Sequence, residues 1–348
     1  MPSTEQATRV EVFDSLDALP DDAAPLFTVS RTFFSTRAWW ETVLAHAMPP
    51  HAAPRLLLVR VDGVASGLFP MLMDPDFRAL TTPYSCLYEP LVAEGADRAA
   101  VFAAFAGYCR RFATTRLDAL DHALAGEFVI GARHAGLAVA RFDHFGNWHE
   151  DVSGLDWTGW LARRPGALRE TIRRRTRRAE RLAGARFQMF CDQNDLEAGI
   201  TAFEAVYARS WKDPEPFPQV NPAQIRAAAS LGLARLGVWW IDGIAAAAQF
   251  WFVEHGQATV LKLAHDEAFK AHSPGTVLTA WMIRHMIQRE QVTALDFGRG
   301  DDPYKQGWVA DRRQRIGLLL INPRKPAGMV ALARHGMGRI KARLRRGG

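Results

Sequence analysis

The chain has 348 residues, of which 48% are hydrophobic and 23% are charged, and its formal net charge is +6 at pH 7. This length predicts two domains of ordinary size, and the apolar content excludes extensive disorder. No apolar run approaches the ~18 residues that a membrane span needs, and the N-terminus has neither the basic nor the apolar region of a signal peptide. We therefore expect a cytoplasmic protein.

Apolar periodicity and one turn signal organise the first half of the chain. Asp62-Gly63 separates two strands and is a strong β-hairpin signal. The predicted strands are 9–13, 55–61, 64–73, 117–120 and 137–145, and the predicted helices are 37–47, 99–112 and 127–134.

The second half repeats this order of elements around a second Asp-Gly turn, Asp242-Gly243. The predicted helices are 157–164, 167–182, 196–211 and 275–288, and the predicted strands are 186–190, 236–241, 244–253, 257–264, 294–297 and 315–321. We expect the last strand to close the second sheet. The repeated order predicts a duplicated domain of the α/β (α+β) class, against the alternative that two common hairpins coincide. We place the domains at 1–154 and 155–323, followed by a basic tail at 324–348.

Residues 273–308 combine a helix start that can bind anions with a short strand and a charged turn. Ser273 suits the N-cap of the helix, Pro274 suits its first position, and Gly275 lets a ligand approach the backbone closely. Free amides at a helix start bind anions. After the strand, Asp302-Pro303 can start another helix.

The sequence Tyr-Lys-X-X-Trp at 304–308 follows Asp-Phe-Gly-Arg-Gly-Asp at 296–301, and Ser-Pro-Gly at 273–275 precedes both. Together they resemble the GNAT-type acyltransferases of the CelD/BcsL group, which is associated with cellulose and exopolysaccharide biosynthesis and is related to the Fem-type peptidyltransferases. The resemblance is strongest over 230–322. It implies tandem GNAT-like domains, each a mixed, mostly antiparallel sheet flanked by helices, with a degenerate first domain and an acyltransferase second domain.

The resemblance implies that the helix start binds the pyrophosphate of an acyl donor. The cradle residues would be Lys270, Ser273, Gly275 and Thr276. We expect acetyl-CoA or another acyl-CoA as a co-substrate, with no permanently bound cofactor. We expect no metal either, because three separated cysteines and scattered histidines show no ligand spacing. The cradle is poorer in Gly and Arg than the usual GNAT pattern, so aminoacyl-tRNA stays open as the donor.

Tyr304 and Asp296 are the candidate catalytic residues. The resemblance implies that the Tyr304 hydroxyl protonates the departing thiolate, and the alternative is an aromatic ring packed with Trp308. Asp296 interrupts an apolar strand and is open between a base, a substrate ligand and an ion pair with Arg299 or Lys305.

Candidate acceptor-binding residues lie in both halves of the chain: Arg299, Asp302, Lys305, Tyr84 and Tyr88. The two first-half tyrosines have the alternative of ordinary loop residues. His265, after the strand that leads into the cradle, is a further candidate base. The resemblance implies an amine or hydroxyl acceptor, on a small molecule or a glycan precursor of the cell envelope or of an exopolysaccharide.

The positive charge is concentrated in two segments. Residues 163–186 hold ten Arg and two Glu, and residues 324–348 hold eight Lys or Arg and no acid, so each segment carries +8. The remaining residues then carry −10, which argues against a uniform nucleic-acid-binding coat.

Each basic segment has a functional interpretation. The Arg run at 169–181 is a solvated helix face or an anion surface, which in a Fem-type transferase would contact tRNA. The tail predicts docking at an anionic membrane surface, peripheral to its inner face. A further alternative is a non-catalytic protein that binds membrane or nucleic acid on a GNAT scaffold.

Overall fold

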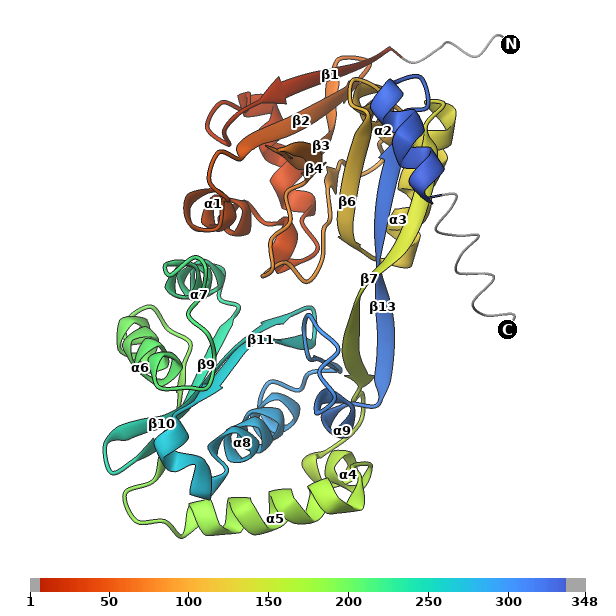
Figure 1. Ribbon diagram of the computed structural model, residues 1–348. Coiled ribbons are helices and arrows are strands. Elements are labelled where there is room, and N and C mark those ends of the chain that lie inside the picture. Colours follow the sequence, from red (N-terminus) through yellow and green to blue (C-terminus); the bar gives the residue numbers. More distant parts are fainter. Residues whose placement is uncertain (1–6, 336–348) are drawn as a thin grey trace, which may run out of the picture. The chain divides into compact units, whose positions relative to one another are not determined.

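The computed structural model describes residues 7–335 and divides into two compact units (Figure 1). Unit 1 comprises Met1–Leu44, Met48–Phe145 and Gln314–Gly348, and unit 2 comprises Ala45–Ala47 and Gly146–Arg313. Strands β7 (Ala138–Asp151) and β13 (Asp311–Ile321) contribute residues to both units, so each unit contains part of these strands.

Unit 1 is built on a mixed, mostly antiparallel sheet with the order β1-β2-β3-β4-β6-β13-β7, in which β5 pairs with β3. Strands β4 and β6 are its parallel pair. Its other elements are β1 (Thr8–Phe13), η1 (Asp21–Val29), η2 (Phe33–Ser35), α1 (Arg37–His46), β2 (Ala53–Val61), β3 (Val64–Asp74), β4 (Asp76–Ala79), β5 (Leu91–Val92), α2 (Arg98–Cys109), β6 (Thr114–Leu120) and α3 (His122–His134).

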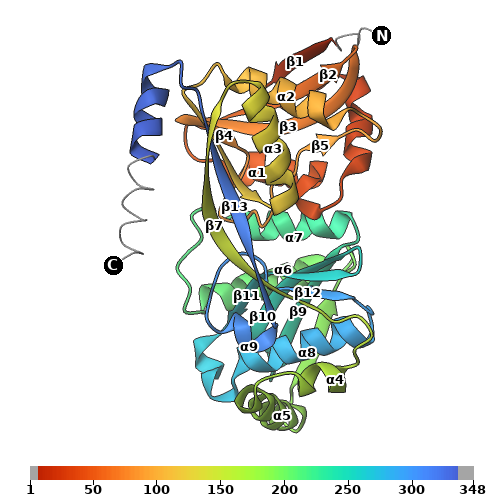
Figure 2. The same ribbon diagram turned by 90° about the vertical axis from the view of Figure 1, so that its right-hand side faces the viewer.

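Helices α2 and α3 lie side by side over this sheet (Figure 2). Phe69 of β3 and Phe105 of α2 stack with ring centroids 4.4 Å apart, and Phe102 and Phe128 pack against them edge-on. Unit 1 therefore has a core of its own.

Unit 2 has the sheet order β13-β7-β12-β11-β10-β9-β8, with β11 and β12 as its parallel pair. Its other elements are α4 (Trp157–Ala162), α5 (Gly166–Glu180), β8 (Arg186–Phe190), α6 (Leu196–Ala208), α7 (Val220–Ser230), β9 (Ala234–Ile241), β10 (Ile244–Glu254), β11 (Gln257–His265), η3 (Glu267–His272), α8 (Pro274–Gln288), β12 (Ala294–Asp296) and α9 (Lys305–Trp308).

Helix α8 packs closely on the sheet of unit 2. A Cβ at Gly237 of β9 would lie 2.3 Å from Sδ of Met282, so any larger residue at this contact would displace the Met282 side chain. Helices α4 and α5 join α8 in the same apolar cluster, which includes the buried rings of Trp160, Trp239 and Trp251. The cluster fixes the start of α8 relative to the strand ends.

Both Asp-Gly turns adopt the backbone that the hairpin prediction requires. Asp62 and Gly63 have φ of 50° and 83°, and Asp242 and Gly243 have φ of 49° and 79°. Positive φ at both central residues is typical of the type I′ turn. The predicted hairpins β2–β3 and β9–β10 are confirmed, as is the mixed, mostly antiparallel sheet flanked by helices in each unit.

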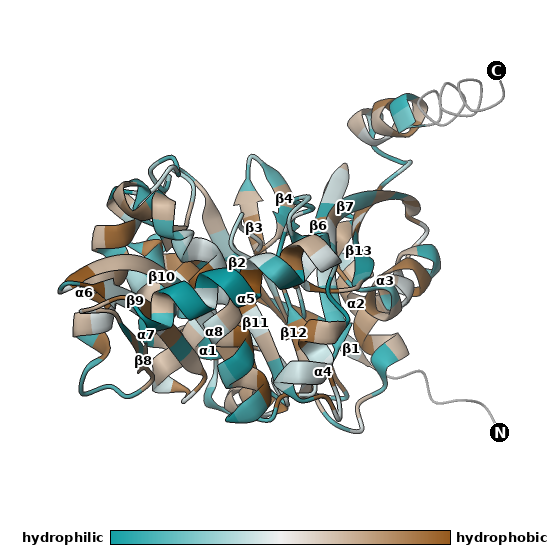
Figure 3. Ribbon diagram, turned by 90° about the horizontal axis from the view of Figure 1, so that it is seen from below, coloured by the Kyte–Doolittle hydropathy of each residue, from teal (hydrophilic) through white to brown (hydrophobic). Residues whose placement is uncertain are grey.

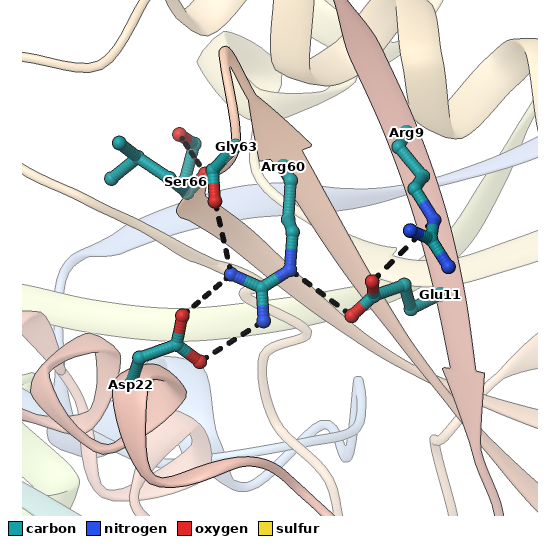
Figure 4. A network of polar contacts seen from close by, with 7 residues as sticks. Arg9, Glu11, Asp22, Arg60, Gly63 and Ser66 are labelled. Atoms are coloured by element: carbon teal, nitrogen blue, oxygen red, sulfur yellow. Dashed lines mark hydrogen bonds and ion pairs between the residues drawn. The ribbon is translucent and has the colours of Figure 1, made fainter.

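The first hairpin is fastened by Arg60 of β2 (Figure 4). Its guanidinium donates to both carboxylate oxygens of Asp22 and to Glu11 at 2.6–3.1 Å, and to the carbonyl oxygen of Gly63 at 3.2 Å. The bond from Arg60 lowers the pKa of Asp22. Arg60 thereby joins β1, η1 and the turn.

The expectation that residues 315–321 close the second sheet is wrong. Strand β13 pairs antiparallel with β6 of unit 1, where Ile316 lies opposite Leu120 and Leu318 lies opposite Leu117. The reason is burial, because Leu318 and its alternating neighbours Ile316 and Leu320 belong to the core of unit 1.

The division between the units also differs from the predicted domain bounds. It falls at Phe145/Gly146 and Arg313/Gln314, within β7 and β13, whereas we placed the second domain at 155–323. Periodicity marks where strands lie in the sequence, and it carries no information about a strand that passes from one unit to the other.

The basic tail at 324–348 is described in part. Residues 326–335 are helical, and Met329, Val330 and Leu332 are exposed. Residues 336–348, on which much of the membrane prediction rests, lie outside the described residues. Within 7–335, no helix is long and apolar enough to cross a membrane.

Candidate active site

Two parallel strands of unit 2 start side by side and then part. Strands β11 and β12 pair from Gln257 opposite Ala294 to Thr259 opposite Asp296. Beyond this pairing β11 continues to His265, and its register against β10 skips one residue between Val260 and Lys262. Such bulges re-aim side chains and are common next to active sites. Ligands of α/β sheets bind outside the carboxyl ends of the strands, so we place the candidate site there.

The first turn of α8 offers backbone amides at this strand end. Ser273 is the N-cap residue of α8 and Pro274 its first residue, as predicted, but Ser273 has φ of 55° and its side chain makes no capping hydrogen bond. Capping side chains reach the first-turn amides from an extended backbone, and the left-handed backbone here removes that geometry. The amides of Gly275 and Thr276 are therefore available to a ligand. Buried Gln249 of β10 donates to the carbonyl oxygen of Gly275 in this turn at 3.5 Å and to Thr279 Oγ1 in the next turn at 2.7 Å.

Two cations lie near this turn. Lys270, which we expected in the cradle, is 75% exposed and pairs with Glu267 at 3.1 Å. Arg175 of α5 was not singled out from the Arg run. Its Nη1 donates to the carbonyl oxygen of Ala271 at 3.0 Å, and its Nε is buried without a hydrogen-bond partner in the part of the chain that the structure describes. Arg175 thus holds the segment before α8 and adds positive charge beside it.

Asp296, at the end of β12, holds the following loop. Its Oδ1 accepts from Asn147 Nδ2 and from the Gly298 amide, both at 2.7 Å, and its Oδ2 accepts from Arg313. Arg313 on β13 reaches the carboxylate from the neighbouring part of the sheet, and Lys305, one of the two expected partners, pairs with Asp302. With both oxygens engaged and 3% exposure, this geometry favours a positioning role over proton transfer.

Lys305 fastens the same loop from its other end. The side chain is buried, donates to the carbonyl oxygens of Arg299 and Gly300 at 2.8 and 3.3 Å, and pairs with Asp302 at 3.1 Å. The three donor positions of the ammonium are used by these contacts, so it has none left for an acyl acceptor. Lys305 therefore holds the loop and does not make the expected contact with the acyl acceptor. Arg299 is partly exposed, and Asp302 is exposed.

Tyr304 follows this fastened loop and immediately precedes α9. It is 47% exposed, whereas Trp308 is buried and stacks on Trp160 at 6.3 Å. The alternative in which Tyr304 packs as a core aromatic is therefore disfavoured, and packing is the role of Trp308. Surrounding protein atoms and the Asp302 carboxylate raise the pKa of Tyr304, so its hydroxyl keeps its proton at neutral pH.

His265, at the end of β11, lies against the start of α8. A Cβ at Gly275 would be 3.3 Å from its Nδ1, and the half-exposed ring of Trp211 packs on the imidazole at 4.3 Å. Burial lowers the pKa of His265, although Glu267, 3.2 Å from Nε2, opposes this effect. The imidazole is therefore uncharged at neutral pH and can accept a proton.

Tyr84 and Tyr88 do not have the exposure that acceptor binding needs. Their exposed fractions are 6% and 2%, and the Tyr88 hydroxyl donates to Met71 Sδ at 3.4 Å inside the core of unit 1. A ligand would have to open that core to reach Tyr88, and Tyr84 is also buried. The sequence placed them in an irregular segment, which predicts a surface loop, and burial overrides this pattern.

The segment between α6 and α7 escaped the sequence analysis. It brings Trp211 to His265, and it brings Lys212 close enough to Asp302 and Lys305 for their charges to act on its pKa. The signal that marks it is a proline at every second position, Pro214, Pro216 and Pro218, which stiffens a charged loop.

With this geometry in hand, comparisons with known proteins are informative. A sequence model of the family described as an acetyltransferase (GNAT) domain matches residues 166–306, which include the start of α8, the loop after β12 and Tyr304. No curated protein matches the sequence.

Solved structures resemble both halves of the chain. One is the C-terminal domain (DUF2156) of a protein assigned as a lysylphosphatidylglycerol synthetase from Agrobacterium fabrum, with 13% identity, 90% of this chain and 94% of that chain covered, and a TM-score of 0.57. FemX has 12% identity, 90% and 98% coverage and a TM-score of 0.57. A tandem GNAT protein from the clavulanic acid biosynthesis pathway has 16% identity, 90% and 98% coverage and a TM-score of 0.50. The expected tandem GNAT-like fold is confirmed, and at these identities the likeness concerns the fold alone.

Proposed function

We propose that this protein is a GNAT-type acyltransferase that moves an acetyl or other acyl group from acyl-CoA to an amine or hydroxyl. The uncapped first turn of α8 at the end of β11 carries the proposal, because its free amides suit the pyrophosphate of the coenzyme. The match of residues 166–306 to an acetyltransferase domain supports it. In line with the resemblance to the CelD/BcsL group, the proposed acceptor is a sugar or a precursor of the cell envelope or of an exopolysaccharide.

The proposed chemistry uses two groups that flank the strand ends. The attacking amine or hydroxyl gives its proton to His265 and forms a bond to the thioester carbonyl carbon. The carbon–sulfur bond then breaks, and the sulfur takes the proton of the Tyr304 hydroxyl. Asp296 and Lys305 contribute by holding the loop that presents Tyr304.

The test is titration of the full chain with acetyl-CoA and longer acyl-CoAs by calorimetry, followed by measurement of thiol release with amine and hydroxyl acceptors. We expect binding of at least one acyl-CoA and thiol release that depends on the acceptor. If the folded protein binds no acyl-CoA, the proposed donor is rejected. Binding without thiol release for any acceptor would favour a non-catalytic GNAT scaffold.

A second candidate is a Fem-type transferase that uses aminoacyl-tRNA. The observation that favours it is a hollow of 460 Å³ along α5, a helix that is largely hydrophilic in Figure 3. Its lining residues are Glu170, Arg174, Arg177, Arg178, Arg181 and Leu182. Four guanidinium groups in one hollow suit a phosphate backbone.

The tRNA candidate has its own test. We expect total tRNA to bind with a steep salt dependence, and the double variant Arg177→Glu, Arg181→Glu to abolish that binding while acyl-CoA affinity is unchanged. Equal tRNA binding by the variant and the wild type would remove α5 from the interface.

We further propose a cytoplasmic enzyme that docks at the inner face of the membrane through the basic tail. In support, Met329, Val330 and Leu332 expose apolar side chains on the helix at 326–335, beside Arg324 and Lys325. Helices that lie in a membrane interface combine basic and exposed apolar residues in this way.

A further inference from the structure

Unit 2 contains a second cavity, between α6, α7 and the loop that joins them. Its volume is 310 Å³, at the lower end of the ~300–1,000 Å³ that small-molecule sites span. The lining residues are Glu204, Tyr207, Ala208, Lys212, Pro214, Glu215, Pro218 and Asn221. This size indicates a small ligand.

One of its two carboxylates is already engaged. Glu215 accepts from the Tyr207 hydroxyl at 2.5 Å and pairs with Lys262 of β11. Asn221 is likewise engaged, because its Oδ1 accepts from Gln224 Nε2 at 3.0 Å. These residues form the fixed wall of the cavity.

The other carboxylate, Glu204 of α6, has an oxygen in need of a donor. Its Oε1 is buried and has no hydrogen-bond partner among residues 7–335. Burial raises the pKa of Glu204, and the charge of Glu215 raises it further. A buried carboxylate oxygen without a donor is costly, and rotation of the Glu204 side chain toward a ligand N–H group in the cavity that it lines would relieve that cost.

Lys212 supplies the opposite charge on the same cavity. Its Nζ lies 5.9 Å from the ring centroid of Tyr207 and 5.6 Å from that of Trp211, and it forms no ion pair with the carboxylates of residues 7–335. Burial lowers the pKa of Lys212, and the positive charge of Lys262 lowers it further. An anionic partner would therefore stabilise the charged form of Lys212.

We propose that this cavity binds an acceptor that carries both an amino group and a carboxylate, that is, a free amino acid or an amino-acid-like zwitterion. The amino group donates to Glu204, and the carboxylate pairs with Lys212. Lys212, which lines the cavity, lies beside Trp211, and Trp211 packs on His265 next to the start of α8. The inference rests on the proposed function in assigning this ligand as the acceptor. It narrows the acceptor class from a sugar or precursor to an amino-acid-like precursor, and its binding can be measured without catalysis.

The experiment measures binding of the twenty L-amino acids to the full chain by calorimetry, each also as its N-acetyl and its amide derivative. N-acetylation removes the ammonium group, and amidation removes the carboxylate. We expect at least one free amino acid to bind and both of its derivatives to bind at least tenfold more weakly. Glucosamine, which has an amino group and no carboxylate, should bind no better than the amides.

Two variants test which side chain recognises the amino group and which recognises the carboxylate. Glu204→Gln should bind the free amino acid at least tenfold more weakly and lose the preference over the N-acetyl form. Lys212→Met should no longer bind the free amino acid more tightly than its amide derivative. The matched controls are Glu180→Gln at an exposed position and Lys325→Met at a partly exposed position of unit 1, and both should bind as the wild type does.

The outcomes separate this inference from the proposed function. Amino-acid binding without acyl-CoA-dependent thiol release would retain the cavity assignment and reject the transfer. Thiol release with other acceptors, combined with no amino-acid binding, would overturn the cavity assignment alone. Preferences that persist in Glu204→Gln and Lys212→Met would also overturn it, and the derivative series on the wild type decides the matter if either variant fails to fold.

Discussion

Gly275 and His265 are so close that a Cβ on Gly275 would lie 3.3 Å from the imidazole Nδ1. The backbone of the proposed donor cradle therefore packs directly against the side chain of the proposed base, at the point where α8 starts and β11 ends.

This contact makes Gly275→Asp a sharp test of the cradle. The new side chain crowds His265 and places a negative charge where the coenzyme pyrophosphate is proposed to lie. We expect acyl-CoA affinity to fall at least tenfold, about 1.4 kcal/mol, by calorimetry. Gly126→Asp, on an exposed position of α3, adds the same charge elsewhere and should leave the affinity unchanged. Unchanged affinity in a folded Gly275→Asp protein would remove the cradle from this site.

Tyr304→Phe tests the general acid. The substitution deletes the hydroxyl and keeps the ring, so we expect kcat to fall about 10²-fold while acyl-CoA affinity stays constant. Because the pKa of Tyr304 is raised, the wild type should show no loss of activity from Tyr304 ionisation between pH 7 and 9. Tyr108→Phe in unit 1 is the control. Wild-type turnover in Tyr304→Phe would exclude Tyr304 from the chemistry.

His265→Gln tests the base through the pH profile. The pKa of His265 is lowered from its ordinary value of 6.5, so the imidazole gains a proton and loses its function as a base only below that pH. We expect kcat/KM of the wild type to decrease on the acid side below pH 6.5. In His265→Gln this limb should vanish and kcat at pH 7.5 should fall about 10²-fold. An identical acid limb in the variant would assign the titration to another group, and His134→Gln controls for surface effects.

A buried ion pair connects the segment after α4 to β7 and to the end of α9. Arg164 pairs with Glu150 at 2.5 Å, both side chains are 3% exposed, and Arg164 also donates to the carbonyl oxygen of Trp308. Glu150→Gln leaves a buried guanidinium without its counterion, which costs about 3–5 kcal/mol of unfolding free energy by urea titration. Glu197→Gln, which breaks an exposed pair with Arg226, should cost much less. Similar costs for the two variants would contradict the burial argument.

The tail prediction concerns membrane docking. A chain ending at Pro323 should stay folded and active on small acceptors, and should lose salt-sensitive binding to anionic vesicles in a sedimentation assay. Each Lys or Arg near such a surface contributes about 1 kcal/mol, screened by salt. Met329→Glu combined with Leu332→Glu should weaken binding without truncation. Equal vesicle binding by the truncated and full-length chains, or none by either, would refute the membrane role.

Local signals in the sequence predicted most of the fold. Asp62-Gly63 and Asp242-Gly243 specify their turns by their own backbone preferences, so the two hairpins and their repeat were readable without tertiary information. Apolar spacing did the same for α8, whose buried side chains lie on several sides of the helix.

The parts that sequence did not predict depend on distant contacts. Asp296 is bound by Asn147 and Arg313, which are 149 and 17 residues away along the chain, whereas the expected partners were near neighbours. The open cap at Ser273 depends on a left-handed φ that serine rarely adopts. Glu204 and Lys212 belong to no motif, and their importance appears only when the cavity and its engaged wall are seen together.

The pairing of β13 with β6 sets an order of events during synthesis. Residues 1–145 leave the ribosome first, but the strand that completes their sheet follows all of residues 146–313. Until then the inner edge of β6 has no partner and offers its backbone groups to any other chain, a recognised route to aggregation. Unit 1 is thus the first part of this protein to begin folding and the last to be completed.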